Sequence, residues 1–467
     1  MIIQETNFVI SKNANYNKGM NESKLSARNW VSIILIGFIG QIAWAIENNF
    51  INLWVYSQSH NSDHIAWMTM ASAVVAAVTT FFIGALSDKI GKRKIFIAGG
   101  YSIWGVFVFL FGVMSFANMK NMTSNNVETA IILVGIGNVI VDCLMTFFGS
   151  TGNDAAFNAY VTDVTNTKNR PLIESILSIM PLFSLALMLL FGGILGIPNA
   201  SLSPEEAQKP WFIFFLITGI LTTAVGVISF FLLPKDQIAP NRDQAYFKHM
   251  VVGFRIKSIK ENPIFYIALL AFMFFNIGVD SFMPYIMVYF QNNPAFGQGQ
   301  FLIGMGIIIG VASLIVIIIG AFLERIGKMK VLIPALLVML AGAIWLFFIQ
   351  EQFALLVIGG ILIMGGYLVG TASLGAEIRD LTPNNNVGAY QSVRMVFVVM
   401  LPMIIGSNVS NMAFQSGMKM NDYGQMEKAP DHYMFLVTSI ACILALIPII
   451  WLIIVKRKQK AQQNQAL

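Results

Sequence analysis

The sequence predicts an all-α membrane protein with twelve transmembrane helices in two pseudo-symmetric halves of six. Composition, a series of long apolar runs and an internal repeat lead to this fold class. Of the 467 residues, 56% are hydrophobic and only 11% are charged, and the mean hydropathy is +0.70. Soluble domains carry about a quarter charged residues. A chain this apolar is expected to bury its surface in a lipid bilayer.

Each predicted helix is an apolar run close to the length of about 20 residues that a spanning helix needs. Unpaired backbone groups cannot face lipid, and the runs lack the alternation of a membrane barrel, so they are predicted to be helices. The twelve runs are Arg28–Val55, Ile65–Leu86, Ile95–Ala117, Thr129–Asn158, Leu172–Ile197, Trp211–Leu233, Pro263–Phe290, Phe301–Leu323, Val331–Ile349, Phe353–Gly375, Val387–Met412 and His432–Val455.

Basic residues indicate the orientation of these helices. The chain has 29 Lys and Arg residues and a net charge of +6. With both termini in the cytoplasm, nearly all of these residues fall on the cytoplasmic side, as expected for a multi-pass protein of the cell membrane. The exceptions are Lys120, Lys209, Lys419, Lys428 and the intramembrane Arg394. The positive charge is therefore interpreted as a topology signal, and no nucleic-acid partner is expected.

An internal repeat divides the chain into two halves. The predicted regions are a disordered cytoplasmic tail (1–27), an N-terminal half (28–233), a cytoplasmic linker (234–262), a C-terminal half (263–455) and a basic cytoplasmic tail (456–467). The stretch "GALSDKIGKRK" from Gly84 matches "GAFLERIGKMK" from Gly320. Likewise "DVTNTKNRPLIES" from Asp163 matches "DLTPNNNVGAYQS" from Asp380. Each pair occupies the same place in its half, which predicts parallel structural repeats.

The repeated motif resembles the cytoplasmic loop signature of the major facilitator superfamily. In addition, "GQIAWAIENNFINLW" and "NAYVTDVTNTKNRPLIES" look like segments of the glycoside–pentoside–hexuronide and sucrose-type sugar/cation symporters. The resemblance implies alternating access around a central cavity lined by the first and fourth helices of each half. The sodium-coupled melibiose-type members carry acidic residues within the second helix, whereas here that helix has none before Asp88. Proton coupling is therefore expected.

Ionisable residues inside the membrane are the main functional candidates, since a charge at the bilayer centre costs roughly 3 kcal/mol. Glu47, Asp142 and Arg394 are predicted to couple the proton. At about 100° per residue, polar residues of the first, fourth and seventh helices share faces that would line the cavity. The predicted substrate-binding residues are Gln41, Trp44, Asn48, Asn52, Asn138, Asn276, Asp280 and Tyr367. The alternative for each amide is a hydrogen bond that joins two helices, and for Arg394 a purely structural salt bridge with Asp88 or Asp142.

A second set of charges is predicted to gate the cytoplasmic side. By analogy with the superfamily, Asp88 should lie near the N-terminus of the eleventh helix, where the helix dipole favours a carboxylate. The other predicted gating residues are Arg93, Asp163, Arg170, Glu174 and Asp380. The alternative is that these are solvated charges that only mark topology.

These observations predict a secondary transporter that imports a sugar or glycoside together with protons. One alternative is a proton/drug antiporter, although "FGGILGIP" lacks the Gly-Pro-Gly-Gly order that such antiporters favour. Another is a non-transporting sensor on the same fold. No spacing of catalytic or metal-ligating residues appears, so neither enzyme activity nor a cofactor is expected. The protein is expected to be a monomer.

Overall fold

The computed structural model describes residues 25–166, 169–198, 204–236, 251–297, 299–383, 387–415, 419–420 and 426–466. Twelve helices in this part of the chain are long and apolar enough to cross a membrane. Each coincides with one of the twelve predicted runs, so the predicted fold class is confirmed. Most of the predicted tail and half of the linker, residues 1–24 and 237–250, lie outside the described residues.

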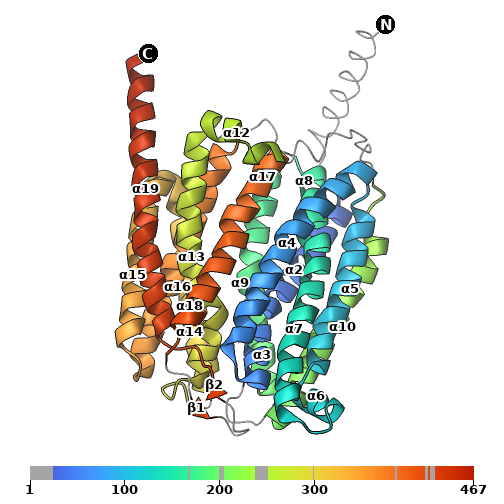
Figure 1. Ribbon diagram of the computed structural model, residues 1–467. Helices are drawn as coiled ribbons and strands as arrows, with labels where there is room; N and C mark the ends of the chain where they lie inside the picture. The colour runs from blue at the N-terminus through green and yellow to red at the C-terminus, as the bar shows by residue number, and fades with distance from the viewer. Residues whose placement is uncertain are drawn as a thin grey trace.

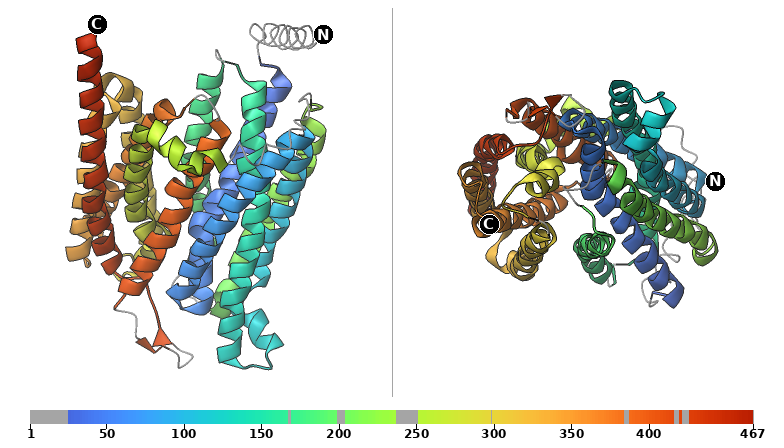
Figure 2. Two further views of the ribbon diagram at one scale, coloured as in Figure 1. Left: turned by 45° about the horizontal axis from the view of Figure 1, so that its top comes forward. Right: turned by 90° about the horizontal axis from the view of Figure 1, so that it is seen from below.

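Figure 1 shows the helices as one bundle with two ends, and Figure 2 shows the N-terminal half beside the C-terminal half. The N-terminal half comprises α2 (Ala27–Ala45), η1 (Ile46–Ile51), α3 (Asn52–Ser59), α4 (Ser62–Ile90), α5 (Lys94–Val113), α6 (Phe116–Met122), α7 (Val127–Gly149), η2 (Ser150–Phe157), α8 (Asn158–Val164), α9 (Arg170–Leu195) and α10 (Pro204–Leu232). The linker contains η3 (Val251–Phe254) and α12 (Ile256–Glu261). The C-terminal half comprises α13 (Pro263–Asn292), α14 (Gln300–Ile326), α15 (Lys328–Phe348), α16 (Phe353–Leu381), α17 (Val387–Met395), η4 (Val396–Met400), α18 (Leu401–Ala413), β1 (Lys419–Met420), β2 (Met426–Glu427) and α19 (Tyr433–Ala466).

Three of the twelve spans contain a π-helical segment. The first span is α2–η1–α3, the fourth is α7–η2–α8 and the eleventh is α17–η4–α18. The remaining spans are α4, α5, α9, α10, α13, α14, α15, α16 and α19. We call the end of the bundle that holds α8, α12 and the C-terminus of α19 the inner end, and the end with α6, β1 and β2 the outer end (Figure 1).

The helix boundaries follow from the capping residues. Ser26, Asn61 and Asn126 stand just before α2, α4 and α7, and each accepts a backbone N–H of the first turn with its side-chain oxygen. Helix α4 ends at Gly91, which has a φ of 70°. This left-handed conformation favours glycine, which explains the glycine in the repeated motif. Gly327, at the same place in the second copy, has a φ of 98°.

Some boundaries differ from the prediction. The third span ends at Val113 rather than at Ala117, because Ser115 caps the short helix α6 by accepting the backbone N–H of Asn118. The predicted basic tail continues the last helix, since α19 extends to Ala466. Neither change moves a residue that lines the centre of the bundle.

Close helix packing in the N-terminal half depends on glycines. Helix α5 packs extensively against α10. A Cβ atom at Gly105 would lie 2.4 Å from the carbonyl oxygen of Gly219, and one at Gly226 would lie 2.3 Å from the backbone nitrogen of Ser102. Small residues let transmembrane helices approach this closely. The halves meet where α4 packs against α17, η4 and α18, and where α9 packs against α14.

Candidate functional site

A cavity of about 320 Å³ lies between the two halves at mid-bundle. Its volume is within the range of small-molecule sites. Spans one, two, four and five form one wall, and spans seven, eight, ten and eleven form the other. The residues of the first wall are Gln41, Trp44, Ala45, Glu47, Asn48, Asn49, Asn52, Met68, Thr69, Ser72, Asp142, Pro181, Leu182 and Leu185. The residues of the second wall are Val279, Asp280, Met283, Pro284, Ile309, Met364, Tyr367, Leu368 and Met403.

The π-helical segment η1 turns successive polar residues toward this cavity. Three consecutive side chains, Glu47, Asn48 and Asn49, all line it. The amide nitrogens of Asn48 and Asn49 donate to the carbonyl oxygens four residues earlier, at 2.9 and 3.0 Å. In a π-helix each backbone N–H donates to the carbonyl five residues back rather than four. The side-chain amides of Asn48 and Asn49 therefore donate to carbonyls that backbone N–H groups would bind in a regular α-helix. Such segments are frequent at functional sites.

Two carboxyl groups face the cavity from neighbouring spans of the N-terminal half. Glu47 is 8% exposed and Asp142 is 1% exposed. The hydroxyl of Thr146 donates to Oε1 of Glu47 at 2.9 Å. Oε2 of Glu47 and Oδ1 of Asp142 are buried without a hydrogen-bond partner among the described residues. Buried acceptors of this kind are costly unless they take up a proton or a ligand, so the pair is a strong candidate for coupling.

Aromatic side chains frame the polar wall. Trp44 lines the cavity, and its ring lies against Trp104 of α5 with ring centroids 4.9 Å apart. Across the cavity, Asp280 of α13 and Tyr367 of α16 belong to the opposite wall. A ligand in the cavity would therefore meet a fixed indole face on one side and a carboxyl and a phenol on the other.

The structure separates the predicted substrate-binding residues into two groups. Gln41, Trp44, Asn48, Asn52, Asp280 and Tyr367 line the cavity, together with the predicted coupling residues Glu47 and Asp142.

Asn138 and Asn276 lie outside the cavity lining and join neighbouring segments instead. The amide of Asn138 donates to the carbonyl of Met114 at 3.1 Å, which ties the fourth span to the end of the third. The amide of Asn276 donates to the carbonyl of Val398 at 2.6 Å. Val398 belongs to η4, where the usual helical ladder is interrupted. Both amides therefore form the interhelical hydrogen bonds that were the alternative to substrate contact.

Several cavity residues were not predicted. Asn49 was missed because the helical wheel assumes a regular α-helix, and η1 breaks that regularity. Thr69 and Ser72 of α4 also line the cavity, and small hydroxyl residues in a transmembrane helix carry no sequence signal that separates cavity lining from helix packing. The apolar lining residues of the C-terminal half carry no signal that separates them from core residues. The only available clue was the run of consecutive polar residues, Glu47 to Asn49.

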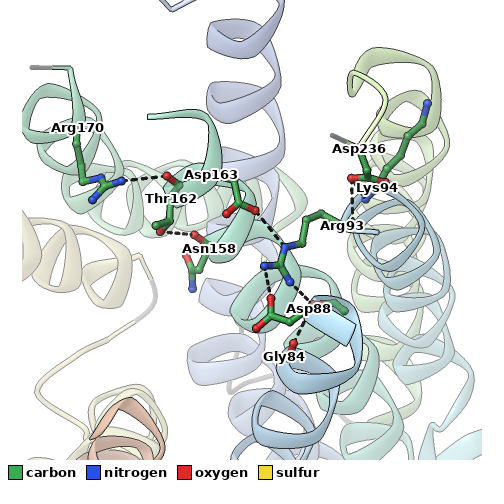
Figure 3. A network of polar contacts seen from close by, with 10 residues as sticks. Gly84, Asp88, Arg93, Lys94, Asn158, Thr162, Asp163, Arg170 and Asp236 are labelled. Carbon is green, nitrogen blue, oxygen red and sulfur yellow. Dashed lines mark hydrogen bonds and ion pairs between the residues drawn. The ribbon is translucent and has the colours of Figure 1, made fainter. Parts of the chain in front are cut away.

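An ion-pair network crosses the inner end of the N-terminal half (Figure 3). The guanidinium of Arg93 pairs with Asp88 at the end of α4, and its Nε donates to Asp163 of α8 at 3.2 Å. Asp236 accepts the backbone N–H of Arg93 at 3.0 Å and caps the start of α5. Three of the predicted gating residues, Asp88, Arg93 and Asp163, thus come together. The predicted partner of Asp88 is the start of the eleventh helix, which begins as α17 at Val387, directly after residues 384–386, which lie outside the described part.

The second copy of the repeat makes a similar contact from the neighbouring basic position. Lys328 begins α15 and forms an ion pair with Asp380 near the end of α16. In both halves, therefore, a basic residue of the loop between the second and third helices binds an aspartate near the end of the fourth. The two motif pairs found in the sequence are the two sides of one contact in each half.

The three remaining predicted site residues are Arg170, Arg394 and Glu174. Arg170 donates to the carbonyl of Thr162 and to the hydroxyl of Thr165, both at 3.0 Å, and so closes the turn between α8 and α9. Arg394 is half-buried on α17, outside the cavity lining. Glu174 lies on α9, and its side chain is not among those described.

Polar contacts join the two halves at the outer end. Asp63 of α4 accepts a hydrogen bond from Asn411 of α18 at 2.6 Å and forms a salt bridge of 2.7 Å with Lys428. The hydroxyl of Ser62 donates to the side-chain oxygen of Asn411 at 2.7 Å. The backbone N–H of Lys428 donates to the carbonyl of His60 at 3.2 Å. We call Ser62, Asp63, Asn411 and Lys428 the outer clamp.

Comparison with known proteins identifies the family. A profile of the Major Facilitator Superfamily matches residues 33–407. The uncharacterized MFS-type transporter YqjV of Bacillus subtilis (strain 168) is 23% identical over 274 residues, which cover 58% of this chain and 59% of YqjV. The match thus spans well under two thirds of that curated relative.

Solved structures share the fold at low identity. A bacterial homolog of the human lysosomal transporter Spinster has a TM-score of 0.70 and 13% identity, over 93% of this chain and 98% of that chain. A mutant of the nucleoside transporter NupG has a TM-score of 0.66 and 13% identity, over 90% and 99%. A D-xylose-proton symporter has a TM-score of 0.65 and 13% identity, over 89% and 96%. At such identities the likeness establishes the fold alone.

Proposed function

We propose, from the premise that this chain belongs to the Major Facilitator Superfamily, that it imports a sugar or glycoside together with protons by alternating access. In this proposal the inner end of the bundle is the cytoplasmic end, the membrane is the cell membrane, and the protein works as a monomer. In the same proposal the outer clamp closes the outer side of the cavity.

The observation that carries the proposal is the acid pair beside an amide-rich wall. Glu47 and Asp142 lie in a cavity between the two halves, with acceptor oxygens that have no partner among the described residues. Gln41, Asn49 and Asn52 surround them with hydrogen-bond donors and acceptors. Sugar hydroxyls need paired donors and acceptors of this kind, and a proton on the acid pair would relieve its buried charge.

The opposite wall narrows the substrate class. Met283, Met364, Leu368 and Met403 give the C-terminal half a mainly apolar lining, with Asp280 and Tyr367 as its polar groups. A glycoside whose sugar ring faces the amides and whose apolar aglycone faces the methionines would satisfy both walls. The same apolar wall favours the second candidate, a proton-coupled antiporter of an amphipathic small molecule.

The decisive experiment is uptake into proteoliposomes. Labelled glucose, xylose, sucrose, maltose and an aryl β-glucoside would be offered with an imposed pH gradient, acid outside. We expect at least one of them to accumulate above its equilibrium level and to lose that accumulation when a protonophore is added. A sodium gradient at constant pH should drive no uptake, because the second span contains no acidic residue between Asp63 and Asp88.

The outcomes separate the candidates. Accumulation of no member of the panel, together with pH-driven movement of ethidium in the opposite direction to the protons, would replace symport by antiport. Uptake driven by sodium alone would move the coupling site from a proton site to a cation site. Binding of a sugar without transport would support the sensor.

A further inference from the structure

A polar stripe runs along the fourth span from the acid pair to the inner end. Every fourth residue over six successive positions is polar, namely Asp142, Thr146, Ser150, Asp154, Asn158 and Thr162. Most of the residues between them are apolar or glycine, including Phe147, Phe148 and Phe157. In a regular α-helix such a stripe would wind by about 40° at each step. The π-helical segment η2, with more residues per turn, offsets this winding where Ser150 and Asp154 lie.

Two side-chain hydrogen bonds connect parts of the stripe, one to the acid pair and one within the stripe. Thr146 donates to Glu47 at 2.9 Å, and Ser150 donates to Oδ2 of Asp154 at 3.0 Å. Successive positions are about 6 Å apart along the axis, a gap that one water molecule can bridge. The stripe therefore offers a chain of groups that both accept and donate protons.

The stripe becomes progressively more exposed toward the inner end. Asp142 and Thr146 are each 1% exposed and Ser150 is fully buried, whereas Asp154 is half-buried. Asn158 and Thr162 are exposed, and Figure 3 shows them at the inner end beside Asp163. Asp154 therefore lies at the boundary between the buried part of the stripe and the part that is exposed at the inner end.

Asp154 is also held in a fixed position. The amide of Asn153 donates to its Oδ1 at 3.0 Å, while Ser150 binds its Oδ2. Tyr101 of α5 donates to the side-chain oxygen of Asn153 at 2.8 Å and so orients the amide. Two titratable groups on the elements packed around η2 lie near Asp154. They are Tyr101 of α5 and Glu47 of the first span. Nearer the inner surface lie the charges of the Asp88–Arg93–Asp163 network.

We infer that Asp154 is the relay through which the Glu47–Asp142 pair exchanges protons with the inner solvent. This inference rests on the proton coupling proposed above. When the pair releases its proton, a carboxyl O–H bond of Glu47 or Asp142 breaks. The hydroxyls of Thr146 and Ser150, or waters between them, each accept one proton and give up another. An O–H bond forms on Asp154, which then passes the proton to water at the inner end. The net change is the transfer of one proton, and each intervening hydroxyl or water breaks one O–H bond and forms another.

The test is the rate at which the acid pair takes up a proton, which needs no substrate. Time-resolved infrared spectroscopy would follow the carboxyl bands of the purified protein after light releases a proton from a caged acid. Glu47→Gln and Asp142→Asn would assign the bands of the pair. We expect Asp154→Asn to slow protonation of the pair roughly tenfold or more, because the variant lacks a positioned group that can accept and release the proton. Asp154→Glu should keep most of the rate.

Controls distinguish a relay from a structural role. Glu128→Gln removes an exposed carboxylate at the outer end of the same span and should leave the rate unchanged. Formate or azide should restore the rate in Asp154→Asn, because a small diffusing acid can replace a missing relay but cannot repair a distorted helix. Protonation of the pair at the wild-type rate in Asp154→Asn, or a slow rate that formate and azide leave unchanged, would overturn the inference.

The failure of this inference can be told apart from failure of the proposed function. If the pair titrates in the wild type but Asp154→Asn has no effect on the rate, only the relay is wrong. If the pair never takes up a proton in the wild type, proton coupling through Glu47 and Asp142 is wrong as well. Sugar uptake in the proteoliposome panel is measured independently of both.

Discussion

Thr146 can orient Glu47 in either protonation state. In the structure its hydroxyl donates to Oε1 of Glu47, as it would to a carboxylate. A hydroxyl can equally accept a hydrogen bond, so the same contact survives when Glu47 carries a proton. A coupling residue must bind and release its proton without losing its position, and this partner allows both. The lack of a described partner at Oε2 leaves that oxygen available for the proton or for a substrate hydroxyl.

Replacing Glu47 should therefore separate coupling from binding. Glu47→Gln keeps the shape of the side chain and cannot release a proton, so we expect loss of pH-driven accumulation with retention of substrate exchange at equal pH. Both are measured on the same proteoliposomes, with Asp142→Asn in parallel. We expect at least one of the two variants to retain exchange. Normal accumulation in both variants would show that neither residue is the coupling site.

At the scale of the helix, the twelve spans could be predicted because length and hydropathy determine them in a bilayer. The repeated motifs from Gly84 and Asp163 predicted parallel repeats, whereas the ion pair that joins the two motifs in each half was not predicted and is a finding of the structure. The wall of the cavity was only partly predictable. A helical wheel gives the direction of a side chain, but not the segment that lies opposite it. Asn138 and Asn276 therefore share a predicted face with true lining residues and yet bond to neighbouring backbone.

Substitutions at Gly226 and Gly99 test the close packing of α5 against α10. Gly226→Ala would place a Cβ atom 2.3 Å from the backbone nitrogen of Ser102, whereas the same change at Gly99, on the opposing helix α5, meets nothing within 4 Å. Overpacking of this kind costs about 1–3 kcal/mol. We expect Gly226→Ala to lower the thermal unfolding midpoint in detergent clearly, and Gly99→Ala to leave it unchanged or slightly raised. Equal midpoints for the two variants would contradict the close approach of α5 and α10.

At the scale of the whole molecule, the outer clamp connects segments that are far apart in the sequence. Asp63 follows the first span, whereas Asn411 and Lys428 flank the loop after the eleventh. In the proposed alternating-access cycle, opening the cavity to the outside would break all of these contacts. The clamp therefore contributes directly to the balance between the two orientations of the carrier.

Lys428→Met should shift that balance toward the outward-open state. The side chains of Lys428 and Asp63 are 33% and 32% exposed, so solvent screens the pair and its contribution is at most about 1 kcal/mol. That free energy corresponds to a population change of up to about fivefold. Labelling from outside of a single cysteine at Leu182, with Cys143 and Cys442 replaced, would report the change. Lys209→Met, which removes an exposed charge from the same end, should label at the parent rate.

Under the proposed coupling, the carboxyl groups of the cavity would also determine which half of the transport cycle responds to voltage. Three of the described lining residues, Glu47, Asp142 and Asp280, are acidic, and none is Lys or Arg. Under the proposed coupling, the proton that enters with a neutral sugar removes one negative charge, so the loaded site is closer to neutral. After release the empty site carries that charge back. A potential that is negative inside repels it outward, with about 2.3 kcal/mol of work per elementary charge and 100 mV. Under the proposed coupling the membrane potential therefore accelerates the return of the empty carrier, and it acts less on the step that carries the sugar, because one negative charge fewer moves with the loaded site.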